Sequence, residues 1–199
     1  MPRHLLVATK NAHKTQEIQQ ILGSAWLVED LNNHPEIIPP EETGVTFAEN
    51  AAIKAVAASI LFPEVVLSDD SGLEVDALGG APGVQSARYA GAHGDDAANR
   101  QKLLTELAPL RSATPIFHAR FRCSMALAEN GRTLATFDGT VEGEIIGSEK
   151  GEGGFGYDSL FVPDGFDQTF AELSSAIKNQ LSHRARAMEK AQIFLSAQA

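Results

Sequence analysis

The sequence predicts an α/β fold, with a mixed β-sheet and several helices in a single domain that spans residues 1–199. Three observations predict it. Apolar runs of strand length alternate with segments whose apolar residues recur at helical spacing. One long segment, residues 117–127, alternates apolar and polar residues with a period of two. The chain has 199 residues, 43% of them hydrophobic, which suffices for one domain with its own core.

The N-terminal segment is predicted to be a strand followed by a helix. Residues 4–8 (HLLVA) form an apolar run of strand length. In the stretch KTQEIQQIL, which starts at residue 14, Ile18, Ile21 and Leu22 recur at helical spacing and would share one helix face.

A second helix is predicted to begin at Thr46, because Thr46 and Glu49 have the spacing of a capping box. It should run to about residue 61, just before Pro63. We expect its apolar stripe to be Ile53, Val56, Ala57 and Ile60. The next segment, VVLSDDSG, is predicted to be a strand that runs into a tight turn.

The C-terminal half contains the clearest strand pattern. A helix is predicted over residues 95–107, followed by the period-two strand over residues 117–127. Asn130 and Gly131 favour a type I′ hairpin turn into a strand over residues 132–137. A short strand (SLFVP) and a last helix from about Ser182 complete the prediction.

The charge and the cysteine content exclude several classes of protein. The net charge of -10 and the pI near 5.0 make polymeric nucleic acid and anionic membranes poor partners. Cys123 is the single cysteine, so no intrachain disulfide forms and a reducing compartment is expected. The N-terminal apolar run is too short for a signal peptide or a membrane span. We therefore expect a soluble cytoplasmic protein.

The stretch GEGGFGYD, from Gly151 to Asp158, contains the pattern G-x-G-x-x-G. A dinucleotide-binding turn needs a helix directly after it, and here a predicted strand follows. We therefore reject the dinucleotide interpretation. A flexible loop remains open, as does a glycine-hinged loop that brings Phe155, Tyr157 and Asp158 close to a flat ligand.

Two acidic segments are candidates for a Mg²⁺ site. Asp69 and Asp70 come directly after a predicted strand, and Glu41 and Glu42 precede the second helix. Mg²⁺ usually takes one or two protein carboxylates. On local chemistry alone, however, an Asx-turn is the favoured interpretation of the aspartates, and a solvated loop that of the glutamates.

Two cationic segments are candidates for binding an anion. The loop from Thr9 to Lys14 connects a strand to a helix N-terminus, where free backbone amides favour negative charge. His183 and Arg184 stand at the start of the last helix, against its dipole, which favours a role in ligand binding over local stability. The alternatives are a polar connector and an ordinary exposed pair. Together these segments suit a nucleoside triphosphate.

These motifs also resemble a known family. TKNAHKTQE, EETGVTFAENAAIKA, SDDSGLEVDALGGAPGVQSARYAG, GEGGFGYD and KNQLSHRARA are similar to the motifs of the inosine triphosphate pyrophosphatase family, the RdgB/HAM1 purine nucleoside triphosphate pyrophosphatases of bacteria. The resemblance extends over nearly the whole chain. It implies hydrolysis of dITP, ITP and XTP to the monophosphate and pyrophosphate. It also implies an elongated fold with two lobes around a deep nucleotide-binding cleft, Mg²⁺ as cofactor, and a homodimer.

The resemblance implies a role for each matching residue. Asp70 would be the general base and a metal ligand, and Glu42 the second metal ligand. Whether Asp69 or Asp70 is the base is not decided by the residues themselves. The substrate-binding residues that the resemblance implies are Thr9, Lys10, Asn11, Ala12, His13, Lys14, Lys54, Ser71, Phe155, Gly156, Tyr157, Asp158, Lys178, His183 and Arg184.

The sequence departs from the family pattern at two positions. Ser159 stands where proline usually follows GGFGYD, and Ile177 replaces an acidic residue before Lys178. Three other functions were weighed: a Maf-type pyrophosphatase, a nucleotide sensor without catalysis, and an RNA-binding module. The motifs around Asp70, Asp158 and Arg184 disfavour the first two, and the acidic charge disfavours the third.

Overall fold

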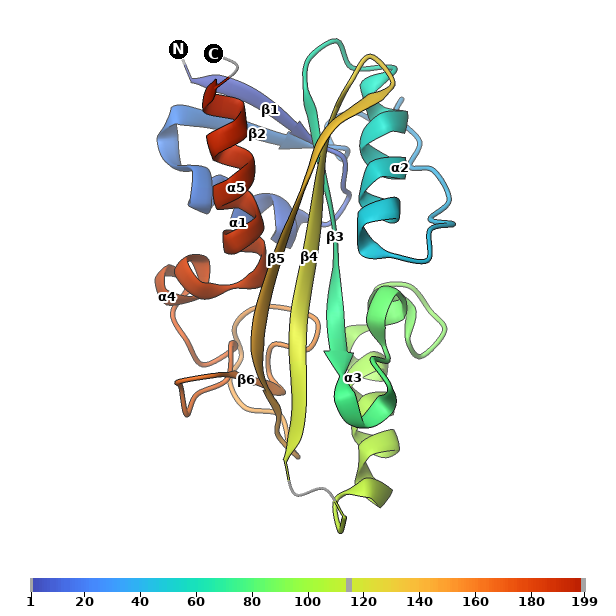
Figure 1. Ribbon diagram of the computed structural model, residues 1–199, viewed down its shortest axis with the longest axis vertical. Coiled ribbons are helices and arrows are strands. Elements are labelled where there is room, and N and C mark those ends of the chain that lie inside the picture. The colour runs from blue at the N-terminus through green and yellow to red at the C-terminus, as the bar shows by residue number, and fades with distance from the viewer. Residues whose placement is uncertain (1, 114–115, 198–199) are drawn as a thin grey trace. The chain divides into compact units, whose positions relative to one another are not determined.

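The computed structural model describes residues 2–113 and 116–197, and it is an α/β structure (Figure 1). The strands are β1 (Arg3–Val7), β2 (Trp26–Asp30), β3 (Val66–Val75), β4 (Phe117–Glu129), β5 (Arg132–Ile145) and β6 (Phe161–Pro163). The α-helices are α1 (Ala12–Leu22), α2 (Phe47–Ser59), α3 (Asp96–Leu107), α4 (Ser175–Leu181) and α5 (His183–Ala197). Short 3₁₀ helices cover Gly23–Ala25, Asp76–Leu78, Gly83–Arg88 and Ala108–Leu110.

The strands form one mixed sheet in the order β2-β1-β3-β4-β5-β6. β1 pairs in parallel with β2 and β3, whereas β5 and β6 are antiparallel. Asn130 and Gly131 both have positive φ angles, 49° and 74°, as a type I′ turn requires. The predictions of a mixed sheet and of the hairpin are confirmed, although β5 extends eight residues beyond its predicted end at residue 137.

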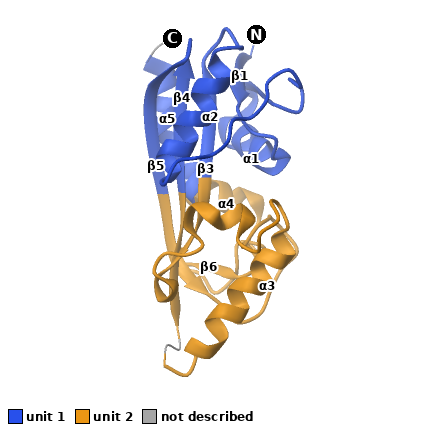
Figure 2. Ribbon diagram, turned by 90° about the vertical axis from the view of Figure 1, so that its right-hand side faces the viewer, with its two compact units in different colours: residues 1–70, 123–139, 183–199 blue, residues 71–122, 140–182 orange. Residues whose placement is uncertain are grey.

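The chain divides into two compact units (Figure 2). Unit 1 contains residues 1–70, 123–139 and 183–199, and unit 2 contains residues 71–122 and 140–182. Strands β3, β4 and β5 contribute residues to both units. The prediction that residues 1–199 form a single domain stays a prediction.

Each unit has its own apolar core. In unit 1, α1 and α5 pack with β1, β3 and β4 around Ile18, Met125 and Met188, all fully buried. In unit 2, three phenylalanine rings form the centre: Phe121 lies 4.8 Å from Phe161, and Phe161 lies 5.1 Å from Phe170, between ring centroids. These edge-to-face and tilted contacts add to the area that the rings bury.

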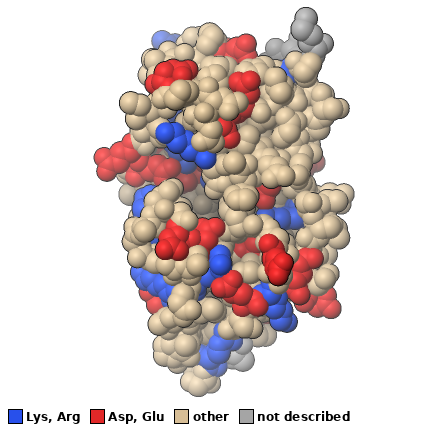
Figure 3. Space-filling model, turned by 180° about the vertical axis from the view of Figure 1, so that it is seen from behind, with Lys and Arg blue, Asp and Glu red and all other residues tan. Residues whose placement is uncertain are grey.

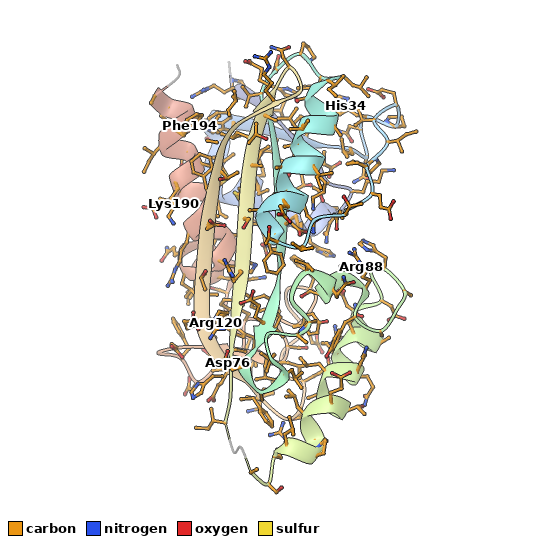
Figure 4. The ribbon with its side chains drawn as sticks, turned by 45° about the vertical axis from the view of Figure 1, so that its right-hand side comes forward. His34, Asp76, Arg88, Arg120, Lys190 and Phe194 are labelled. Atoms are coloured by element: carbon orange, nitrogen blue, oxygen red, sulfur yellow. The ribbon has the colours of Figure 1, made fainter. Side chains whose placement is uncertain are left out.

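Arg120, on the part of β4 that belongs to unit 2, has acidic partners on neighbouring segments. Arg120 donates two hydrogen bonds to Asp76, of 2.9 and 3.2 Å, and the two side chains point toward each other in Figure 4. Its Nε also donates to Glu142 at 3.0 Å. Over the face drawn in Figure 3, acidic and basic side chains are interspersed. None of the helices in the described residues is long and apolar enough to cross a membrane.

The predicted turn in the DDSG segment is wrong. Ser68, Asp69, Asp70, Ser71 and Gly72 all lie inside β3, which continues to Val75. The register with β1 covers only Val66 and Leu67, so from Ser68 onward the strand continues beside its other neighbour in the sheet, β4. Gly72 has a different use: a Cβ there would come within 2.3 Å of Ser86 Oγ, which accepts a hydrogen bond from the Leu73 amide.

The predicted apolar stripe of α2 is wrong in part: Val56 packs against the buried face of the helix, whereas Ile60 does not. The helix begins at its Thr46 capping box, as predicted, but Ile60 is 67% exposed and follows the last helical residue. Beyond Phe47 and Asn50 in its first turn, the buried face consists of small residues, including Ala51 and Ala55, which pack against Ala126 on β4. Alanine lets the helix approach the strand closely, and the bulkier residues of the predicted stripe lie beside this face.

Candidate active site

Asp69 on β3 is the centre of a buried ion cluster in unit 1. Its side chain is fully buried, and Lys14 Nζ lies 3.0 Å from its Oδ1. Arg184 donates to Asp69 Oδ2 through Nε at 3.1 Å and Nη2 at 2.9 Å. Burial by itself raises the pKa of Asp69, but the charges of Lys14 and Arg184 outweigh it and hold the pKa well below its ordinary value. Asp69 therefore stays ionised and acts as an anchor for two cations.

Asp70 has a different environment although it is the next residue. Adjacent side chains on a strand point to opposite faces of the sheet. Asp70 is 8% exposed, and its Oδ1 lies 3.2 Å from Lys54 Nζ. Among the described residues, its buried Oδ2 has no hydrogen-bond partner. Burial raises the pKa of Asp70, with the Lys54 charge opposing the shift. Asp70 is thus the aspartate suited to accept a proton.

Glu42 joins Asp70 through a shared lysine. Lys54 Nζ lies 2.9 Å from Glu42 Oε1, so one ammonium group bridges both carboxylates. The loop that carries Glu42 is held to α2, because Asn50 accepts a hydrogen bond of 2.8 Å from the Gly44 amide. The two acidic segments that the sequence singled out therefore meet in unit 1.

The pair of Glu42 and Asp70 fits the ligand preference of Mg²⁺. Within residues 2–113 and 116–197, no group of three or more His, Cys, Asp or Glu side chains is arranged to hold a metal ion. Mg²⁺ does not need such a group, since it keeps several waters and binds through one or two carboxylates. The buried Asp70 Oδ2, which receives no hydrogen bond from the described residues, is a suitable ligand atom.

In the loop from Thr9 to Lys14, more backbone amides have hydrogen-bond acceptors than the sequence predicted. Asn11 is the N-cap of α1, and its Oδ1 accepts hydrogen bonds from the amides of His13 and Lys14, at 3.0 and 3.4 Å. The Asn11 amide donates to Thr9 Oγ1 at 3.1 Å. The expectation of free amides is therefore wrong at these three positions, because the loop caps its own helix. Lys10, Ala12 and His13 are exposed.

His183 and Arg184 are buried, not an exposed pair. They are 4% and 1% exposed, at the start of α5. Besides Asp69, the Arg184 guanidinium donates to Glu17 on α1. Glu17 is a member of the cluster that the motifs did not predict, although Lys14 and Glu17 are three residues apart and so share one face of α1.

In unit 2, the glycine loop is held by its own side chains. Asp158 Oδ2 accepts hydrogen bonds from the Phe155 amide at 2.8 Å and from Lys178 Nζ at 2.6 Å. Gly154 has a φ of +72°, and a Cβ there would come within 2.1 Å of Asp158 Oδ2. The loop leads into β6 through turns, so the rejection of a dinucleotide-binding turn is confirmed.

The other predicted residues of unit 2 lie around this loop. Lys178 is 5% exposed, and its Nζ lies 5.2 Å from the centroid of the Phe155 ring. Tyr157 is 3% exposed and donates a hydrogen bond of 2.9 Å to the Ser86 carbonyl, which makes it part of the core. Ser71 is half-buried on β3.

The structure therefore groups the predicted residues into two sets. Unit 1 contains Thr9, Lys10, Asn11, Ala12, His13, Lys14, Glu42, Lys54, Asp70, His183 and Arg184. Unit 2 contains Ser71, Phe155, Gly156, Tyr157, Asp158 and Lys178. The first set holds a buried carboxylate of raised pKa beside cations, and the second holds an aromatic ring beside a buried cation.

Comparison with known proteins gives a consistent result over the whole chain. The chain is 47% identical over 195 residues to a protein of Desulforamulus reducens named dITP/XTP pyrophosphatase, covering 96% of this chain and 95% of that protein. It is 48% identical over 188 residues to a protein of the same name from Halalkalibacterium halodurans, covering 93% and 95%.

The structure is likewise similar to a HAM1 protein from Coxiella burnetii, with a TM-score of 0.85, 37% identity, and coverage of 98% of this chain and 99% of that one. The Staphylococcus aureus Ham1 protein gives a TM-score of 0.83 at 39% identity, covering 99% and 100%. The model of the Ham1 family matches residues 5–194. The chain belongs to the Ham1 family.

Proposed function

We propose that this protein hydrolyses noncanonical purine nucleoside triphosphates, namely dITP, ITP and XTP, to the monophosphate and pyrophosphate. Such an activity removes deaminated purines from the nucleotide pool. Relatives named dITP/XTP pyrophosphatase that are 47–48% identical over nearly the full chain support it. The structural observation that carries it is Asp70, a buried carboxylate with a raised pKa beside Lys54 and Glu42.

Asp70 is the proposed general base. Its raised pKa favours taking a proton from the attacking water near neutral pH, where an ordinary aspartate is a weaker base. Lys54 stays protonated, because Asp70 and Glu42 raise its pKa against the opposing effect of burial. A protonated lysine at this place stabilises negative charge that moves onto the departing pyrophosphate. The Thr9–Lys14 loop is proposed to bind the phosphates.

Mg²⁺ is the proposed cofactor, held by Glu42 and Asp70. When bound, it supplies Lewis-acid neutralisation of phosphate charge. Asp69 has a supporting role in this proposal: with its negative charge it fixes Lys14 and Arg184, and so orders the start of α1 and of α5.

In unit 2, the purine base is proposed to contact the Phe155–Asp158 loop and Lys178. The Phe155 ring offers a flat surface, and Lys178 offers a donor for a 6-oxo group. A donor aimed at a 6-oxo group faces the amino group of adenine unfavourably. Hydrogen-bond mismatches of this kind discriminate by about 10⁴ or more.

A product assay tests the reaction. The purified protein is incubated with Mg²⁺ and dITP, XTP, dATP, dGTP or dTTP, and pyrophosphate is resolved from orthophosphate. We expect pyrophosphate from dITP and XTP, and little product from the other three. Chelation of the metal with EDTA should abolish turnover, and added Mg²⁺ should restore it. Orthophosphate release, or equal rates on all bases, would contradict the proposal.

A homodimer in the cytoplasm is the proposed state of the protein, on the basis of the family resemblance. Light scattering coupled to size-exclusion chromatography tests the assembly, because the chain mass is 21.2 kDa and a dimer has twice that mass. A monomeric mass at micromolar concentration would contradict it.

A further inference from the structure

In unit 2, two side chains of helix α3 form hydrogen bonds with the backbone of Gly156, between Phe155 and Tyr157. Asp96, the first residue of α3, accepts a hydrogen bond of 2.7 Å from the Gly156 amide. Arg100 donates a hydrogen bond of 2.9 Å from Nη1 to the Gly156 carbonyl. The amide belongs to the peptide that follows Phe155, and the carbonyl belongs to the peptide that precedes Tyr157. Two successive peptide planes are thus fixed by one helix.

The positions of Asp96 and Arg100 on α3 suit hydrogen bonding to a single residue, Gly156. Asp96 and Arg100 are four residues apart and share one face of α3. A carboxylate in the first helical turn is also favoured by the helix dipole, so the charge of Asp96 suits its place in α3. Gly156 has a φ of +62° with open space around its Cβ position. Glycine therefore suits this position because of its backbone conformation and not because of crowding.

Arg100 is itself fixed by a further residue of the loop. Its Nε donates to Glu149 at 2.8 Å, and Glu149 also accepts a hydrogen bond of 3.1 Å from Ser159. Ser159 is the position at which this chain departs from the proline of the resembled family. Through this hydrogen bond, Ser159 is connected to the Arg100–Glu149 ion pair, and Arg100 in turn binds Gly156. Proline has no hydroxyl group and could not form the hydrogen bond to Glu149.

We infer that Asp96 and Arg100 are positioning residues for recognition of the purine base. They orient the two Gly156 peptides, and through them the Phe155 ring. The inference rests on the proposed function, in which Phe155 contacts the base. Neither side chain needs to touch the substrate. Their loss should weaken binding of the base while leaving the chemistry at Asp70 in unit 1 intact.

Steady-state kinetics on dITP test the inference with Asp96→Ala and Arg100→Met. We expect each variant to raise KM about tenfold with kcat within about threefold of the wild-type value. The double variant should raise KM by less than the product of the two single effects, because both residues act on Gly156. Asp96→Asn should stay within about threefold in KM, because its amide oxygen still accepts the Gly156 hydrogen bond. The control is Gln101→Ala on the same helix, whose side chain is exposed.

Three results would overturn the inference. A KM within about twofold of wild type in both variants would show that the loop is oriented without α3. A fall in kcat at unchanged KM would show that the two residues act on the chemical step and not on binding of the base. Impairment of Asp96→Asn equal to that of Asp96→Ala would indicate loss of the charge and not of the hydrogen bond. Failure of the proposed function is distinguishable, since the wild-type protein would then release no pyrophosphate from dITP.

Discussion

At the residue scale, the two neighbouring aspartates of β3 differ because their surroundings differ. Asp69 faces two cations, so its charge is compensated where it is fully buried. Asp70 shares a single lysine with Glu42, and burial dominates its pKa. A carboxylate that must stay ionised and one that can accept a proton are thereby placed on adjacent positions of one strand.

We expect Asp69→Asn to reduce the free energy of unfolding by roughly 3–5 kcal/mol, because it leaves the buried Arg184 and Lys14 without their shared counter-ion. Urea denaturation followed by circular dichroism measures the loss. Because the pKa of Asp69 is lowered on folding, its contribution is complete above the unfolded pKa of about 4, decreases as the pH falls below that value, and is lost as the pH reaches the lower folded pKa. The difference between variant and wild type should therefore shrink in acid; a difference that is constant down to pH 3 would contradict this account.

Asp70→Asn should affect activity more than stability. Loss of a general base typically lowers kcat by about 10²–10⁴-fold, measured here at saturating dITP and Mg²⁺. Lys54 keeps Glu42 as a partner, so the loss of stability should be smaller than in Asp69→Asn. Asp164→Asn is the matched control, because Asp164 is exposed. Unchanged turnover in Asp70→Asn would rule out Asp70 as the base.

At the scale of elements, α2 shows how close packing replaces a bulky apolar stripe. Ala55 is fully buried against alanines of β4, whereas Ile60 is 67% exposed. The approach of α2 to the sheet depends on these small side chains. The helix in turn carries Lys54 and, through Asn50, holds the loop of Glu42.

Two substitutions test whether the observed face of α2, and not the predicted apolar stripe, packs against the sheet. Ala55→Leu should destabilise the protein by about 1–3 kcal/mol, because the extra volume has no space between helix and strand. Ile60→Gln should change stability by less than about 0.5 kcal/mol, as exposed positions generally do. Thermal unfolding of both variants measures the contrast. A larger loss of stability for Ile60→Gln than for Ala55→Leu would instead support the predicted apolar stripe.

The glycine loop allows a second comparison within one element. Gly154 and Gly156 both have positive φ angles, +72° and +62°. Alanine at either position pays a backbone strain of about 1 kcal/mol. Only Gly154→Ala also places a Cβ against Asp158, which would break the hydrogen bond to the Phe155 amide. We therefore expect a larger fall in melting temperature for Gly154→Ala than for Gly156→Ala; equal falls would show that strain alone matters.

At the scale of the whole molecule, stability should depend on pH through a chain of acids and histidines in unit 1. Glu29 Oε2 lies 3.0 Å from His34 Nε2 and 3.2 Å from His4 Nε2. His34 also faces Glu36, and His4 faces Glu64. The hydrogen bond to Glu29 raises the pKa of His34, and the same bond lowers the pKa of Glu29.

The two shifts predict the pH range in which this pairing stabilises the fold. The raised pKa of His34 contributes stability below about pH 6.5, which is lost as the pH rises through the folded pKa. The lowered pKa of Glu29 contributes stability above about pH 4.5, which is lost on acidification. Melting temperatures of His34→Gln should therefore fall below wild type at pH 5.5 and approach it at pH 8.5. The exposed His93→Gln is the control, and an equal difference at both pH values would contradict the prediction.

Much of this protein could be predicted from local sequence. Some elements depend only on residues that are close together in the chain, and their patterns can be recognised from the sequence alone. They are the period-two strand, the Asn130-Gly131 turn and the Thr46 capping box. The motifs likewise predicted the family to which the chain belongs. The rejection of the dinucleotide turn needed only the strand that follows the glycines.

Tertiary structure decided the rest, because it depends on contacts between distant residues. Whether SDDSG turns or continues as a strand depends on the neighbouring strand β4. Whether Arg184 is exposed depends on Asp69, which lies 115 residues earlier in the chain. The two aspartates have the same side chain and nearly the same position in the sequence. Only the fold gives one of them two cations and leaves the other with a shared lysine, and a pKa responds to burial and neighbouring charge, which no local pattern records.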